Sequence, residues 1–204
     1  SDFPPAEWAG PEFDDSEWSV SRVPVAPSNW YMSLLCVRAR FMVDAPETAE
    51  DVKLTIGYRG GVRVFLNGKE ITRSHLSEGD ISFMTPADPY PKEAYLTSGG
   101  SLLSHVWHKR KPELLKVRER SVSDIVIDKG MLKKGANVLA VEIHRAPIDQ
   151  AMISKRPRHS FSQYWWRTLV LSRLTLTAGS GSVKPNTACP KKLYVTNYPS
   201  VQLA

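Results

Sequence analysis

Residues 52–71 have the sequence VKLTIGYRGGVRVFLNGKEI, and this stretch decides the fold class. Apolar and polar side chains alternate over residues 52–58 and again over residues 62–66, which is the period of a half-buried β-strand. Asn67-Gly68 follows the second run, and an Asn-Gly pair favours the positive φ angles of a tight type I′ turn. We therefore predict a hairpin, with the two runs as the central pair of strands of a β-sandwich.

The same alternation recurs along the chain. It predicts further strands at residues 34–43, 123–127, 138–144 and 169–177, and a short helix is predicted at residues 113–120. Several strands, little helix and long connections are typical of a two-sheet β protein. We expect an all-β fold, an antiparallel jelly-roll β-sandwich with long loop insertions.

One domain is expected over residues 1–178, because 204 residues with 42% hydrophobic usage can bury one sizeable core. Residues 74–123 form a long irregular insertion in this domain. Such an insertion is uncommon unless it packs on the domain or carries a function, so it is the first place to look for a site. Residues 179–204 are expected to be a linker and C-terminal tail, or the first strand of a following element.

The net charge of +6 favours anionic partners, such as acidic glycans, nucleic acid or anionic lipid surfaces. Composition does not choose among them. No apolar run approaches the roughly 18 residues that a membrane helix needs, so no membrane span is predicted.

An acidic segment contains Asp14, Asp15 and Glu17 between two aromatic residues. These carboxylates could hold a structural calcium ion, but a turn capped by Asp and Ser side chains explains the same pattern without further ligands. His105 and His108 lie three apart and have no evident third ligand. We therefore expect no metal site and no cofactor, with structural calcium as the alternative at the acidic turn.

The two cysteines, Cys36 and Cys189, could form one disulfide. Cys36 lies within the apolar alternation of residues 34–43, where a reduced and buried thiol is the alternative. The sequence leaves both interpretations open.

Several short motifs follow one another in an order that resembles a known family. They are FDDSEW at residues 13–18, Val23-Pro24, RARF at residues 38–41, residues 61–68, residues 132–135, residues 137–142 and Trp165-Trp166. Over about residues 8–177 the chain resembles the galactose-binding-like jelly roll, above all the sugar-binding domain of family 2 glycoside hydrolases and related ancillary modules of large secreted bacterial proteins. The insertion at residues 74–123 is longer than the connection usual in that family, and nothing resembles its catalytic barrel.

The resemblance implies a noncatalytic module of a larger extracellular or periplasmic protein, which binds carbohydrate or packs against a neighbouring domain or subunit. A sugar site needs an exposed aromatic plane, with planar polar side chains that engage neighbouring hydroxyls. Candidate ligand-binding residues at expected loop positions are Tyr58, Arg59, Trp107, His108, Tyr164 and Trp165. Each could instead pack inside the domain, and for Trp166 burial is expected.

No catalytic constellation is apparent, because no feature of the sequence brings two carboxylates together and no motif places a nucleophile. We therefore predict that the chain is not an enzyme. One competing function is a structural or assembly protein that associates with neighbouring subunits through its loops and C-terminal tail. Another is a polyanion binder that uses HKRK at residues 108–111 and KRPRH at residues 155–159, although nucleic acid is not the expected partner.

Overall fold

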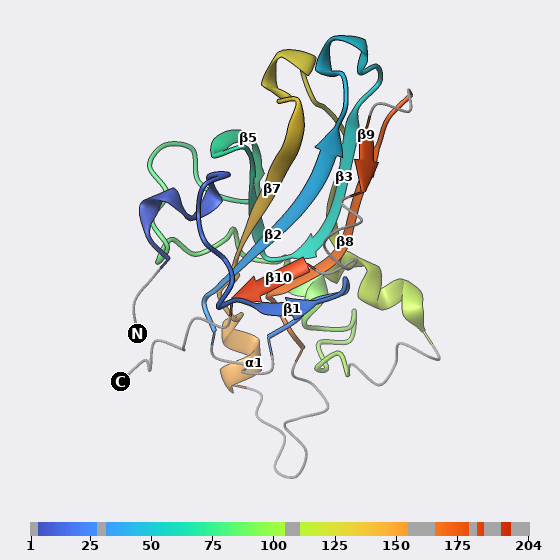
Figure 1. Ribbon diagram of the computed structural model, residues 1–204. Helices are drawn as coiled ribbons and strands as arrows, with labels where there is room; N and C mark the ends of the chain where they lie inside the picture. Colours follow the sequence, from blue (N-terminus) through green and yellow to red (C-terminus); the bar gives the residue numbers. More distant parts are fainter. Residues whose placement is uncertain are drawn as a thin grey trace.

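The structure is a computed structural model that describes residues 4–27, 32–104, 111–154, 166–179, 183–185 and 193–196. Two antiparallel sheets form a sandwich (Figure 1). The larger sheet has the order β1 (Ser19–Ser21), β10 (Leu193–Thr196), β2 (Leu34–Val43), β7 (Gly135–His144), β4 (Gly61–Leu66) and β5 (Lys69–Ser74), and β9 (Val183–Pro185) also pairs with β2. The smaller sheet has the order β6 (Arg120–Val126), β3 (Lys53–Arg59) and β8 (Val170–Thr177). The predicted all-β antiparallel sandwich is confirmed.

The stretch at residues 52–71 contributes to both sheets. Asn67 and Gly68 have φ angles of 52° and 86°, so the predicted tight turn forms, and it joins β4 to β5. The prediction that the two alternating runs pair with each other is wrong, because β3 lies in the smaller sheet and β4 in the larger one. The chain changes sheets at Gly60, whose φ of 109° suits glycine.

The main core lies between the sheets and is built by the residues that alternate inward. Leu54, Ile56, Val64, Val141 and Leu171 are among its members, and each is completely buried. A second apolar cluster covers the outer face of the larger sheet, where Trp8 and Trp18 of the N-terminal segment pack on β2, β4 and β7. The N-terminal segment is therefore an ordered third layer.

The predicted strands are found at nearly the predicted positions. The strand at residues 34–43 is β2 without any shift, while those at 123–127, 138–144 and 169–177 correspond to β6, β7 and β8. The predicted helix is the 3₁₀ helix Pro112–Arg118. Further short helices are the 3₁₀ helices Ala6–Ala9, Pro46–Thr48, Lys92–Ala94 and Lys129–Met131 and the single described α-helix, α1 (Gln150–Ser154).

The insertion at residues 74–123 packs on the domain through a third apolar cluster. Tyr90, Tyr95 and Leu102 of the insertion contact Met152 of α1 and Trp166, which precedes β8. Figure 1 shows α1 at the lower end of the sandwich, opposite the turns that follow β2 and precede β7. The insertion, α1 and Trp166 together build up this end of the molecule.

Residues 183–185 and 193–196 belong to the larger sheet. β9 pairs with residues 41–43 of β2, and β10 pairs with residues 36–38 of β2 and with β1. Among the described residues, no helix is long and apolar enough to cross a bilayer.

Candidate functional site

The structure places the two described candidates, Tyr58 and Arg59, on different sides of the smaller sheet. Tyr58 is completely buried in the main core, with its hydroxyl 2.8 Å from His75 Nδ1, so its ring offers no exposed plane. Arg59 is half-buried and forms an ion pair with Glu119, with 2.8 Å between Nε and Oε1. These two neighbours therefore do not form one site.

The other predicted site residues lie outside the described residues. They are Trp107, His108, Tyr164 and Trp165, together with Cys189 of the candidate disulfide, His105, most of the HKRK segment and all of KRPRH.

Cys36 is a free and completely buried thiol. Burial raises its pKa well above the usual value, and the negative charge of Glu142, which faces it across the β2–β7 ladder, adds to this effect. A protonated, buried thiol is a poor nucleophile. Cys36 thus serves packing on the outer face of the larger sheet.

The carboxylates of the acidic segment have protein partners. Asp14 Oδ1 accepts a hydrogen bond from the backbone N–H of Ser16 at 2.9 Å and closes the turn, which lowers the pKa of Asp14. Asp15 is buried and binds Arg38 and Arg40, each at 2.8 Å. In the described part of the chain no three His, Cys, Asp or Glu side chains gather as metal ligands would.

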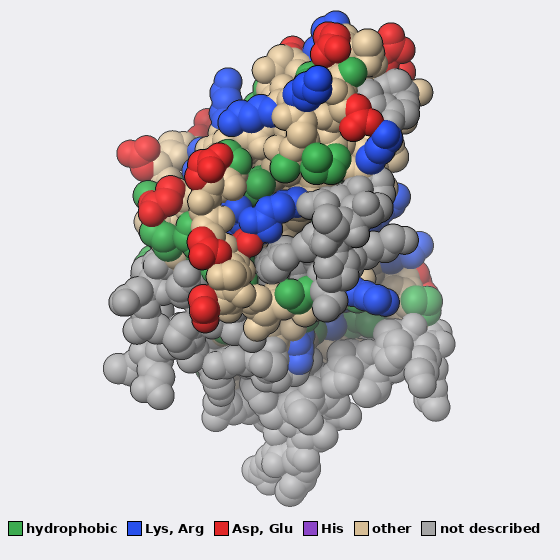
Figure 2. All heavy atoms as spheres, viewed as in Figure 1, with side chains coloured by type: hydrophobic (Ala, Val, Ile, Leu, Met, Phe, Trp, Pro, Cys, Tyr) green, Lys and Arg blue, Asp and Glu red, His purple; other side chains and the backbone are tan. Residues whose placement is uncertain are grey.

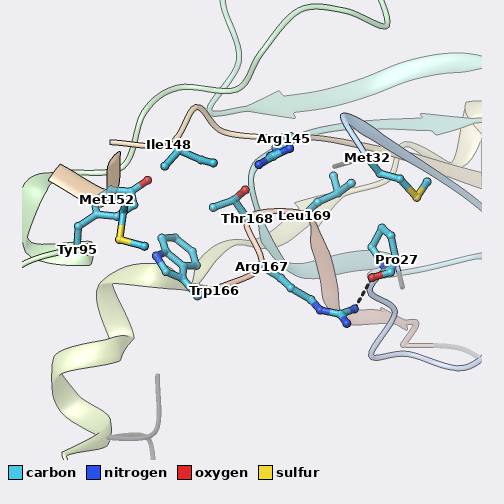
Figure 3. Close-up of a pocket in the computed structure, with 10 residues that line it drawn as sticks. All are labelled: Pro27, Met32, Tyr95, Arg145, Ile148, Met152, Trp166, Arg167, Thr168 and Leu169. Atoms are coloured by element: carbon cyan, nitrogen blue, oxygen red, sulfur yellow. Dashed lines mark hydrogen bonds between the residues drawn. The ribbon is translucent and has the colours of Figure 1, made fainter. Parts of the chain in front are cut away.

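A small cavity lies at the built-up end of the sandwich (Figure 3). Its described lining consists of Pro27, Met32, Tyr95, Arg145, Ile148, Met152, Trp166, Arg167, Thr168 and Leu169. The cavity has a volume of about 20 Å³, which is room for one or two water molecules. Arg145, Ile148 and Arg167 are half-buried and form the rim, while the other lining residues are buried.

The lining comes from four segments that the sandwich brings together. The β2–β7 ladder continues past its last pair, because the backbone N–H of Arg145 donates to the Ser33 carbonyl at 2.8 Å. Val25 forms a bridge with Leu171, which places Val25 beside the start of β8. Asp149 Oδ1 accepts from the Ala151 N–H at 2.8 Å and so fixes the first turn of α1.

Trp166 forms one wall of the cavity and is held by rings and by a cation. Its ring centroid lies 4.8 Å from that of Tyr90 and 5.6 Å from that of Tyr95. The guanidinium carbon of Arg118 lies 4.8 Å from the Trp166 ring. Only 6% of Trp166 is exposed, and its indole Nε1, which is itself buried, has no hydrogen-bond partner among the residues that the structure describes. Such a buried donor is uncommon.

The charged side chain described in contact with this wall, Arg118, is basic. Arg118 is buried and donates to the carbonyls of Ala94 (2.8 Å) and Leu103 (2.9 Å), and no carboxylate of the described residues forms an ion pair with it. Burial lowers the pKa of Arg118 to about 10, so the side chain remains a cation at neutral pH. Burial also raises the pKa of Tyr95 to about 12, so this wall carries no phenolate.

The described lining contains two arginines and no acidic residue. Arg167 donates to the Pro27 carbonyl, as Figure 3 shows. By contrast, basic and acidic side chains are interspersed on the upper part of the face in Figure 2. The described members of the lining include no His, Asp, Glu, Cys or Ser.

Sequence reasoning predicted the burial of Trp166 but missed the cavity. One signal was available, since Asp149 is the last acidic residue of the sequence, whereas residues 150–204 contain eight Lys or Arg. No family model matches the chain, and no curated protein matches it.

Proposed function

We propose that the chain is a noncatalytic carbohydrate-binding module, an ancillary part of a larger extracellular protein, and that its cavity receives a polar group of the glycan. The observation that carries this proposal is the cavity itself, whose described lining combines the rings of Tyr95 and Trp166 with the hydroxyl-bearing Thr168 and two arginines. Aromatic rings pack against the apolar face of a sugar, and hydroxyl and guanidinium groups bond its oxygens.

Three further features support the proposal. The order of sequence motifs resembles that of a sugar-binding sandwich, and the fold is an antiparallel sandwich. The cavity combines apolar side chains with a few polar groups, which is the usual composition of a small-ligand site. It is too small for a whole sugar ring, so the ring would lie at the rim beside Arg145, Ile148 and Arg167.

Calorimetric titration with a panel of mono- and oligosaccharides tests the proposal. Trp166→Phe keeps an aromatic ring but replaces the larger indole that forms one wall of the cavity, so we expect it to weaken any saturable binding. Trp8→Phe is the matched control, because Trp8 is also buried but lies in the N-terminal cluster. The proposal fails if no glycan gives saturable heat, or if both variants bind like the unmodified chain.

A second candidate function, association of copies through the C-terminal segment, is favoured by the place of β10. Among the described strands β1 pairs only with β10, so the strand from one copy could fill the same position in another. Light scattering after size exclusion should then give a larger mass for the full chain than for one that ends at Gly179. Equal monomeric masses would contradict association.

A further inference from the structure

We propose that residues 75–88 form a pH-sensitive loop, the His75 loop, which is closed at neutral pH and opens when His75 binds a proton. The backbone N–H of Asp88 donates to the His75 carbonyl at 2.9 Å, so the two ends of the loop meet. Compact surface loops whose ends lie close together are frequently functional. The inference concerns a movement of the fold and does not depend on the ligand proposed above.

The first argument is the conformation of His75. Its φ angle of 55° lies in the left-handed region, which is unfavourable for a residue with a Cβ and persists only where contacts impose it. The hydroxyls of Tyr58 and Ser74 lie 2.8 Å and 3.1 Å from its Nδ1. The rings of His75 and Tyr58 also meet edge to face, with 5.9 Å between their centroids. The contacts of one ring therefore hold the start of the loop in a strained conformation.

The second argument is the surroundings of this ring. His75 is half-buried against Tyr58, and Arg120 of β6 acts on it with a positive charge. Asp88 acts on it with a negative charge but is exposed, where water screens its effect. Burial, and after it Arg120, lowers the pKa of His75 below its usual value of 6.5, so the ring is neutral at neutral pH.

Arg120 is held at the closing end of the loop. Its guanidinium donates at 2.8–3.1 Å to the carbonyls of Gly60, Asp88 and Pro89. It cannot move away from a protonated His75 without losing bonds to the end of the loop. Because the closed loop holds His75 at a lowered pKa, the stability of the closed state is present above pH 6.5 and is lost as the pH falls through the lowered value.

The third argument is a second histidine that holds the same loop. His144 Nδ1 lies 2.8 Å from the Thr85 carbonyl, which can only accept, so this nitrogen donates. The Ala87 N–H donates to the Arg145 carbonyl at 3.0 Å, which fastens the loop to the residue after β7. Both histidines of the described residues thus hold this loop, and histidine is the side chain that titrates most readily near neutral pH. Since Arg145 lines the cavity, opening would also reach the candidate site.

Amide hydrogen exchange tests the inference, with each measured rate divided by the intrinsic rate at the same pH. Between pH 7 and pH 5 we expect the protection of the Ala87 and Asp88 amides to fall at least about threefold, because their hydrogen bonds close the loop. The control amide is that of Ile127, which donates to the Val52 carbonyl at 2.9 Å near the opposite end of β3 from Tyr58. Its protection should not change.

His75→Asn is the matched variant. Asparagine adopts the left-handed conformation readily, and its amide oxygen can accept a hydrogen bond from Tyr58, but it does not titrate. The variant should keep its loop protection at pH 5. In the unmodified chain, the midpoint of the loss of protection should coincide with protonation of the His75 ring, followed by NMR, and this second measurement keeps the test usable if the variant does not fold.

Unchanged protection of Ala87 and Asp88 at pH 5 overturns the inference. An equal loss at Ile127 also overturns it, because acid would then loosen the whole sandwich. The same loss in His75→Asn, or a midpoint that differs from that of the His75 ring, overturns His75 as the trigger.

Discussion

Gly60, where the chain passes from one sheet to the other, makes a sharp prediction about stability. We expect Gly60→Ala to lower the free energy of unfolding by about 2–6 kcal/mol. The φ angle of 109° is unfavourable for any residue with a Cβ. The added Cβ would also lie 2.1 Å from the carbonyl oxygen of His144 and 2.9 Å from that of Thr168.

The magnitude has two parts that a second variant separates. Backbone strain at this φ costs about 1–3 kcal/mol, and Gly79→Ala carries that part alone, since Gly79 has a φ of 97° and no atom within 4 Å of its Cβ position. The clash adds about 1–3 kcal/mol, because the His144 carbonyl belongs to β7 and cannot retreat without disturbing its pairing with β4.

Urea unfolding followed by tryptophan fluorescence measures both variants, and comparison at equal slope gives the difference in stability. Gly60→Ala should be less stable than Gly79→Ala by the cost of the clash. Equal losses would refute the reasoning, because they would mean that the crossing is looser than the structure indicates. Since Thr168 lines the cavity, Gly60→Ala should also weaken ligand binding where the variant still folds.

Three further outcomes are expected. Asp15→Ala should lower the free energy of unfolding in urea by about 3–5 kcal/mol, because it leaves Arg38 buried without its counter-ion. Glu119→Ala breaks the more exposed pair with Arg59 and should lower it by less than about 1 kcal/mol. Burial raises the folded-state pKa of Tyr95 from 10.0 to about 12, so its contribution to stability is present below pH 10 and is lost as the pH rises toward 12. Tyr95→Phe should therefore make the melting temperature fall less steeply between pH 10 and pH 12. Cys36 should resist a thiol reagent in the native protein and react in urea without a reductant, and a lack of reaction in urea would indicate a disulfide instead.

The strands could be predicted from the sequence because their signal is local. Alternation over residues 34–43 defines β2 to the residue, and Asn67-Gly68 defines the turn between β4 and β5. Both signals depend on neighbouring side chains only. The pairing of the strands is not local. At Gly60 the sequence reads like a short connection between neighbours, and only the approach of the His144 carbonyl shows that the chain changes sheets there.

The candidate site was beyond prediction for a related reason. Tyr95, Arg118, Arg145 and Trp166 come from segments that are far apart in the sequence, and no spacing rule connects them. The aromatic candidates for ligand binding were predicted to present exposed rings next to polar groups. In Tyr58 the structure shows the opposite case, a ring whose alternation with Leu54 and Ile56 placed it in the main core.

At the cavity wall, two buried polar side chains, Trp166 and Arg118, lack the described partners that such groups usually have. A phenylalanine at this position would keep the ring contacts with Tyr90 and Tyr95 without leaving an N–H unpartnered. A leucine or methionine in place of Arg118 would avoid a buried cation, whose described partners are two carbonyls. Trp166 and Arg118 lie in contact with each other. Because departures from local consistency are expected at functional sites, their coincidence beside the cavity makes this end of the sandwich the first place to test by substitution.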